Sequence, residues 1–159
     1  MPDVSGDWDA ELRSNWPEIK RRMEGETTNG GETPPVKAKI KIMARFFFVR
    51  INLDSENHYS SSKTIFVRVA RDQEDGGIRL YYIYSNTTLE PAPTDAAQHY
   101  GAAYLDVIRG QGRNLWMEGT YWTNRNWHKG LNTAGKVTLR RSAPTQGFWR
   151  RLVRSWFGR

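Results

Sequence analysis

The chain has 159 residues, enough for one domain with a buried core, and its 38% hydrophobic and 13% aromatic residues predict a folded protein. It contains no cysteine, which excludes disulfides and thiolate metal sites, and no apolar run approaches the roughly 18 to 20 residues of a membrane-spanning helix. The net charge of +7 is uneven, because nine Lys or Arg follow Glu118, the last acidic residue, and the preceding part sums to about −2. The C-terminal quarter is therefore expected to contact any anion that binds.

The N-terminal segment from Val4 to Asn15 alternates apolar and polar residues, which predicts a β-strand. Trp8 lies on the apolar face of this strand, and we interpret it as a plug in the core of a barrel. A short helix is predicted from Pro17 to Arg22, because proline suits the first helical turn. Residues 24–35 then form a polar, glycine-rich connection.

The longest alternating run extends from Val36 to Leu53. Its apolar residues occupy even positions as far as Phe48, and the alternation resumes on odd positions at Val49. A β-bulge produces such a one-residue change of phase and lets a strand bend sharply. We therefore predict two strands that share one bent backbone and form the spine of a small barrel.

Five further segments alternate in the same way and are predicted to be strands. They cover residues 63–71, 78–86, 99–109, 115–123 and 135–141. In the first, Ile65, Val67 and Val69 are expected to share a face. In the second, one face is expected to carry Leu80, Tyr82, Tyr84 and Asn86. Residues 72–77, with two glycines at the end, predict a hairpin. Short links between successive strands indicate an all-β, lipocalin-like fold: a closed antiparallel up-and-down barrel of about eight strands.

The C-terminal tail differs from the rest, so we divide the chain into a ligand-sensing barrel over residues 1–145 and a basic tail over 146–159. Aromatic and aliphatic residues recur at helical spacing in the tail, with Arg150, Arg151 and Arg154 on the opposite face. This pattern predicts a short amphipathic helix. The helix could pack on the barrel or lie on an anionic membrane surface, and the sequence leaves both open.

The sequence offers no catalytic or metal-binding motif. His58, His99 and His128 have no spacing typical of a metal site, and no nucleophile, phosphate-loop or paired-carboxylate motif is present. We therefore predict a protein that is not an enzyme and that needs no metal or cofactor.

Polar aromatic residues on the expected inner faces instead suggest a receptor. Tyr82 and Tyr84 share one strand, Tyr121 and Thr123 share another, and Arg125 follows directly. A barrel of about eight strands can hold one small ligand, tyrosine rings stack on bases, and arginine pairs with phosphate oxygens. The alternative is that the phenols only reach the rim and Arg125 pairs with a loop acid.

Three stretches together resemble a known family. They are residues 6–12 (GDWDAEL), the serines 60–62 with the YIYSN sequence at 82–86, and residues 115–125 (LWMEGTYWTNR) with Gly130, Gly135 and the VTL sequence at 137–139. Over roughly residues 6–141 the chain is similar to the β-barrel sensor domain of two-transmembrane-helix effectors in bacterial CBASS anti-phage systems.

This resemblance implies a receptor for a cyclic dinucleotide that a partner CD-NTase makes. Family members carry two transmembrane helices ahead of the barrel, associate into homo-oligomers on activation and disrupt the inner membrane. Such helices are missing here, so we expect either a piece of a longer protein or a free-standing relative. The implied location is a cytoplasmic domain at the bacterial inner membrane, held by those helices or by the basic tail.

The site that we predict lies at the barrel mouth. Tyr84 and Tyr121 are its stacking or hydroxyl partners, Arg125 its phosphate partner, and Tyr82 a neighbouring phenol. Hydrogen bonds are assigned to Asn86, Thr123 and Ser61. Two other functions stay open. One is a lipocalin-like carrier of an apolar ligand, and the other is a single-stranded nucleic-acid binder that stacks bases on Trp116, Trp122 and Trp127.

Overall fold

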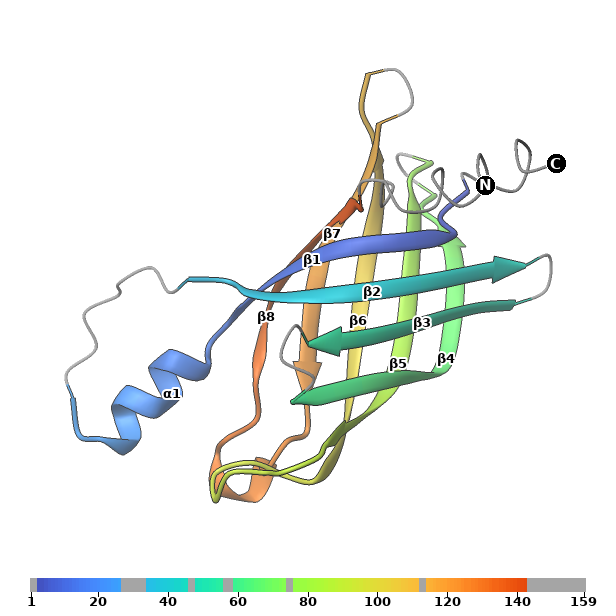
Figure 1. Ribbon diagram of the computed structural model, residues 1–159. Coiled ribbons are helices and arrows are strands. Elements are labelled where there is room, and N and C mark those ends of the chain that lie inside the picture. The colour runs from blue at the N-terminus through green and yellow to red at the C-terminus, as the bar shows by residue number, and fades with distance from the viewer. Residues whose placement is uncertain are drawn as a thin grey trace, which may run out of the picture.

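The computed structural model describes residues 3–26, 34–45, 48–55, 59–73, 76–111 and 114–142. Within these ranges, eight antiparallel strands close into one barrel (Figure 1). The strands are β1 (Gly6–Ser14), β2 (Val36–Arg45), β3 (Phe48–Ser55), β4 (Ser60–Arg71), β5 (Ile78–Thr88), β6 (Gln98–Arg109), β7 (Leu115–Thr123) and β8 (Ala134–Arg141). The helix α1 (Trp16–Met23) follows β1, and the 3-10 helix η1 (Trp127–Lys129) lies between β7 and β8.

The barrel has the predicted up-and-down order. Each strand pairs with the next one in the sequence, and β8 returns to pair with β1, where Trp8 lies opposite Arg141 and Leu12 opposite Val137. Successive side chains on a strand face opposite sides of the sheet, so Trp8 and Ala10 of β1 both point into the core as predicted. Closure leaves no free sheet edge among the described strands. The all-β barrel prediction is confirmed, whereas the predicted C-terminal helix falls outside the described residues.

The prediction of one bent strand from Val36 to Leu53 is wrong. This segment is a hairpin, in which β2 and β3 run antiparallel, with Ile42 opposite Ile51 and Arg45 opposite Phe48. When two residues separate the strands of a hairpin, even-numbered residues of one strand pair with odd-numbered residues of the other. The inward-pointing residues therefore change from even to odd numbers, which is the same change that a bulge produces. The two residues between the strands are outside the described part of the chain.

A bulge does occur, but in β4. The register between β4 and β5 shifts between Thr64 and Phe66, so Ile65 is the extra residue, and 58% of its surface is exposed. The expectation that Ile65 shares a face with Val67 is therefore wrong, since only Val67 packs against the core.

One end of the barrel is filled by side chains. Trp8 is fully buried there, and its indole Nε1 donates a 3.0 Å hydrogen bond to the Val4 carbonyl, which confirms its predicted role as a plug. The other large, fully buried side chains are Val4, Ile40, Ile42, Leu80, Leu105, Met117 and Leu139. A cavity with room for a ligand lies toward the opposite end.

That opposite end carries α1 and the connections after β5 and β7 (Figure 1). The predicted helix is confirmed, with a proline in its first turn, Glu18 near its positive end and basic residues in its last turn. Asn15 fixes the start of the helix through two hydrogen bonds to Ala134, both 2.9 Å long. The Asn15 backbone N–H donates to the Ala134 carbonyl, and the Asn15 side-chain oxygen accepts from the Ala134 backbone N–H. Among the described residues, no helix has the length and apolar character needed to cross a membrane.

Candidate ligand-binding site at the open end of the barrel

A cavity of about 160 Å³ opens at the end of the barrel beside α1. Its walls come from all eight strands and from the connection after β7. The lining residues are Leu12, Val36, Ala38, Leu53, Ser55, Ser60, Ser62, Tyr82, Tyr84, Asn86, His99, Tyr121, Thr123, Arg125, Thr133 and Val137. Apolar walls with a few polar groups are typical of small-molecule sites.

Three tyrosines form the floor and side of the cavity. The rings of Tyr82 and Tyr84 lie 5.6 Å apart between centroids, tilted by 38°. Burial raises the pKa of both phenols, and it also raises the pKa of Tyr121, against the opposing effects of a Ser14 hydrogen bond and the Arg125 charge. All three phenols are therefore neutral near pH 7, with hydroxyls that can donate to a ligand and ring faces that can stack.

Gly101 on β6 makes room for one of these rings. It pairs with Tyr84, and a methyl group built on Gly101 would lie 2.3 Å from Tyr84 Cζ. No Cβ atom can occupy that space, so the position of the Tyr84 ring depends on the missing side chain.

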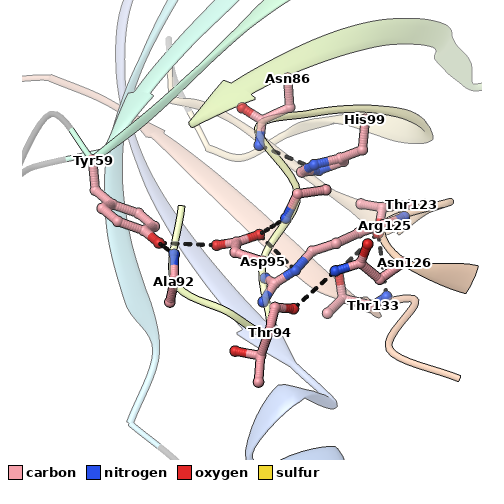
Figure 2. A network of polar contacts seen from close by, with 11 residues as sticks. Tyr59, Asn86, Ala92, Thr94, Asp95, His99, Thr123, Arg125, Asn126 and Thr133 are labelled. Carbon is pink, nitrogen blue, oxygen red and sulfur yellow. Dashed lines mark hydrogen bonds and ion pairs between the residues drawn. The ribbon is translucent and has the colours of Figure 1, made fainter. Parts of the chain in front are cut away.

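Buried His99 and half-buried Asn86 form a polar pair in the cavity wall (Figure 2). Asn86 Nδ2 lies 3.3 Å from His99 Nε2, and because an amide NH₂ can only donate, Nε2 is the acceptor and the proton of the neutral ring sits on Nδ1. Burial lowers the pKa of His99, the Arg125 charge lowers it further, and Asp95 opposes them. His99 Nδ1 and Asn86 Oδ1 have no hydrogen-bond partner among the described residues, which is costly for buried polar atoms.

Arg125 is held between an acid and an indole. Its Nε lies 2.8 Å from Asp95 Oδ1, and the two side chains are only 16% and 7% exposed. The distance is that of an ion pair, yet the Nε–H is not aligned for a hydrogen bond to any described acceptor. The guanidinium carbon also lies 4.3 Å from the centre of the Trp16 ring, a cation–π contact that links the cavity to α1.

The connection after β5 is fixed to the barrel by Asp95 (Figure 2). Tyr59 Oη donates to Asp95 Oδ2 at 3.1 Å, the Ala92 N–H donates to Tyr59 Oη at 3.2 Å, and the Ala96 N–H donates to Asp95 Oδ1 at 2.9 Å. Asn126 Nδ2 donates to the Thr94 carbonyl at 3.0 Å from the other side. Arg125 thus sits in a preformed loop network.

Thr123 positions the chain around Arg125. Its hydroxyl lies 2.9 Å from the Thr133 hydroxyl and accepts bonds from the Thr133 N–H at 3.2 Å and the Arg125 N–H at 3.4 Å. The hydroxyl is therefore occupied by the protein, and its part in the site is to hold the turn after β7.

A second hollow lies outside the barrel, between α1 and the connection after β5. This outer groove has a volume of about 540 Å³. Its lining residues are Trp16, Lys20, Met23, Glu24, Tyr59, Ala92, Thr94, Asp95 and Arg125. Among the described residues, only Arg125 lines both the barrel cavity and the outer groove.

Comparison with known protein families matches residues 1–141 to the family described as Cap15, cyclic dinucleotide receptor domain. The chain belongs to this family. A curated relative, CD-NTase-associated protein 15 from Escherichia albertii, is 32% identical over 140 residues, which are 87% of this chain and 61% of the relative. The chain therefore spans about three fifths of the length of that relative, and the resemblance seen in the sequence is confirmed.

Within this Cap15 receptor domain, the barrel cavity contains six of the seven predicted site residues: Tyr82, Tyr84, Asn86, Tyr121, Thr123 and Arg125. Ser61, the seventh, is not among the lining residues. The flanking Ser60 and Ser62 line the cavity, and strand alternation turns the residue between them away from it.

Sequence reasoning missed His99, Asp95 and Trp16. The pairing of His99 with Asn86 across β5 and β6 could have been found from the hairpin register, because both residues fall at strand ends on the inward phase. Asp95 and Trp16 carried no such signal, since their positions depend on the path of α1 and of an irregular loop. In the described part of the chain, no cluster of His, Asp or Glu could hold a metal ion.

Proposed function

We propose that this chain binds a cyclic dinucleotide at the open end of its barrel and acts as a receptor, not as an enzyme. Membership of the Cap15 receptor domain family supports the ligand class. The observation that carries the site is the barrel cavity itself, which combines buried neutral phenols, an arginine and two buried polar atoms without partners. A ligand with ring faces, base edges and phosphates would satisfy all three.

Each group then has a role that follows from its chemistry. Tyr84 and Tyr121 stack on a base or donate hydroxyl bonds, with Tyr82 packed beneath Tyr84. The two unpartnered atoms, His99 Nδ1–H and Asn86 Oδ1, offer one donor and one acceptor to a base edge, the pattern that polar base readout needs. Neither atom is exposed to solvent in the free domain, so the two side chains must rotate for these atoms to reach the ligand.

Arg125 is proposed as the phosphate partner, but it is already paired with Asp95. A ligand phosphate must therefore compete with the carboxylate for the guanidinium, or approach its other N–H groups. Asp95 lowers the affinity for every anion in this scheme, while it keeps Arg125 and the loop in place. This arrangement combines the two roles that the sequence left open for Arg125.

For the longer protein, we propose that ligand binding promotes association and that the assembled protein disrupts the bacterial inner membrane. The tail after residue 145 could add membrane contact through its basic and aromatic residues. Binding drives association only if the assembled form binds the ligand more tightly. Light scattering of this chain with and without ligand tests the first step, and an unchanged mass would argue that the described domain senses without assembling.

The ligand class is tested by thermal shift with a panel of cyclic dinucleotides, their linear counterparts and a short oligonucleotide. At about one hundred times Kd, a bound ligand adds about 2.7 kcal/mol, which shifts the Tm of a chain of this size by about 5–10 °C. We expect such a shift for at least one cyclic dinucleotide. If none shifts the Tm, the proposal fails. A steeply salt-dependent shift with the oligonucleotide alone would favour the nucleic-acid binder.

The apolar-carrier alternative predicts a continuous apolar lumen. Packed side chains fill the end of the barrel around Trp8, so the space for a ligand is short and ends at polar groups. Binding of fatty acids or hydrophobic dyes, without any response to nucleotides, would restore that alternative.

A further inference from the structure

The barrel cavity is too small for the whole of the proposed ligand. Its volume is about 160 Å³, whereas ligand pockets usually enclose about 300–1,000 Å³. A ring of two nucleotides is larger than many drug-sized molecules. Some part of such a ligand must therefore lie outside the strands.

The outer groove is the neighbouring space that could take this part. It is larger, at about 540 Å³, and Arg125 lines it as well as the barrel cavity. A guanidinium at the junction of two hollows suits a ligand whose phosphates lie between its two nucleosides, because each phosphate can reach the same cation.

The helix α1 forms one wall of the groove. Trp16, Lys20, Met23 and Glu24 line it, and their spacing of three to four residues places them along one helical face. Ile19 is buried and anchors the helix, while the facing wall is the loop network around Asp95. The groove thus has two structured walls, one with an indole and a primary amine.

We propose that a cyclic dinucleotide bridges the two hollows, with one nucleoside in the barrel cavity and the second in the outer groove against Trp16. The phosphates lie near Arg125, and Lys20 contacts the outer side of the ring. This inference rests on the proposed function and adds α1 to the receptor site.

The contacts of Trp16 and Lys20 fit these roles. Trp16 already lies 4.3 Å from the Arg125 guanidinium, so the stacking surface and the cation are positioned together. Lys20 lies 3.8 Å from Glu24 in an exposed pair with side chains 63% and 49% accessible, and exposed pairs of this kind are weak. The amine can therefore leave Glu24 for a phosphate without much loss.

The test titrates the parent chain and its variants with two ligands. One is the cyclic dinucleotide that binds the parent most tightly, and the other is the matching 5′-mononucleotide, whose binding is followed by NMR. Loss of base stacking should raise the Kd of the cyclic ligand by roughly tenfold to a hundredfold in Trp16→Ala, with much of the affinity kept in Trp16→Phe. Lys20→Ala should raise it several-fold, and more at low salt. The mononucleotide, whose one nucleoside is proposed to lie in the barrel cavity, should bind these variants within about twofold of the parent.

Trp127→Ala is the matched control, because Trp127 is 69% exposed and lines neither hollow. It should bind both ligands like the parent.

Unchanged cyclic-ligand affinity in both Trp16→Ala and Lys20→Ala would overturn the inference. So would an equal loss for the mononucleotide in Trp16→Ala, since Trp16 would then only support Arg125. If the parent binds no cyclic dinucleotide, the proposed function itself fails, which is a separate outcome. Lys20→Ala changes an exposed side chain, so folding does not confound its result.

Discussion

Replacing Arg125 with alanine removes the one cation that, in the described part of the chain, lines both the barrel cavity and the outer groove. A charge-assisted contact to a phosphate contributes about 1.5–3 kcal/mol, so the Kd of a cyclic dinucleotide should rise by roughly tenfold to a hundredfold. The same change leaves Asp95, which is 7% exposed, without its partner. Breaking a buried pair in this way costs about 3–5 kcal/mol of stability, so a drop in Tm should accompany the loss of binding.

Asp95→Asn separates the two effects. It removes the competing negative charge and keeps an oxygen that can accept from Tyr59 or Ala96. A phosphate about 6 Å from a carboxylate, at an effective dielectric of about 20, is repelled by about 3 kcal/mol, so the variant should bind the ligand more tightly than the parent does. Lost loop contacts reduce this gain but should not reverse it.

Isothermal titration calorimetry of the parent, Arg125→Ala, Asp95→Asn and the double variant measures the coupling between the two residues. The double variant should be more stable than Arg125→Ala, because no uncompensated charge stays buried. Parent-like affinity in Arg125→Ala would refute the assigned phosphate contact. Weaker binding in Asp95→Asn would show that the carboxylate supports the ligand site and does not compete with the phosphate.

Three more predictions concern the walls and the plug of the barrel. Gly101→Ala should displace the Tyr84 ring, which costs about 1–3 kcal/mol by overpacking and weakens nucleotide binding; denaturant unfolding and a titration would check both, and unchanged binding would argue against a role for Tyr84. The fold lowers the pKa of His99 from its ordinary 6.5, so the unfolded chain takes up a proton at a higher pH than the folded chain does. The free energy of unfolding should therefore decrease as pH falls below about 6.5, until the lower folded-state pKa is passed. His99→Gln should lose that part of the pH dependence. If urea titrations across pH gave the same stability profile for His99→Gln and the parent, this prediction would be contradicted. Trp8→Ala should cost about 3–5 kcal/mol, because the side chain is fully buried, with ligand contacts at the other end retained; a Tm close to that of the parent would contradict its role as a plug.

The barrel was predictable because the period of two extends through nearly every strand, and closure follows when successive hairpins leave both terminal strands to pair. The hairpin of β2 and β3 was not predictable, since the two residues between these strands in the sequence are phenylalanines and not the glycine or asparagine that mark a hairpin. A two-residue turn and a bulge change the phase identically, and only pairing such as Ile42 with Ile51 distinguishes them. The bulge at Ile65 was missed for the same reason, because its apolar side chain fits the pattern although it lies outside.

The lining of the barrel cavity was predictable where it lies on strands and not where it depends on loops. Tyr82, Tyr84 and Tyr121 were placed by alternation, which sends every second residue inward. Ser60 and Ser62 line the cavity in place of the predicted Ser61, since a run of three serines does not reveal which of them points inward. Asp95 is brought to Arg125 by a loop path that no periodicity encodes.

Isothermal titration of the parent chain with the cyclic dinucleotide panel tests the central claim most directly. The account predicts saturable binding of at least one cyclic dinucleotide, which the corresponding linear dinucleotide does not match. Absence of heat and of saturation for every cyclic dinucleotide, with the chain folded, would contradict it.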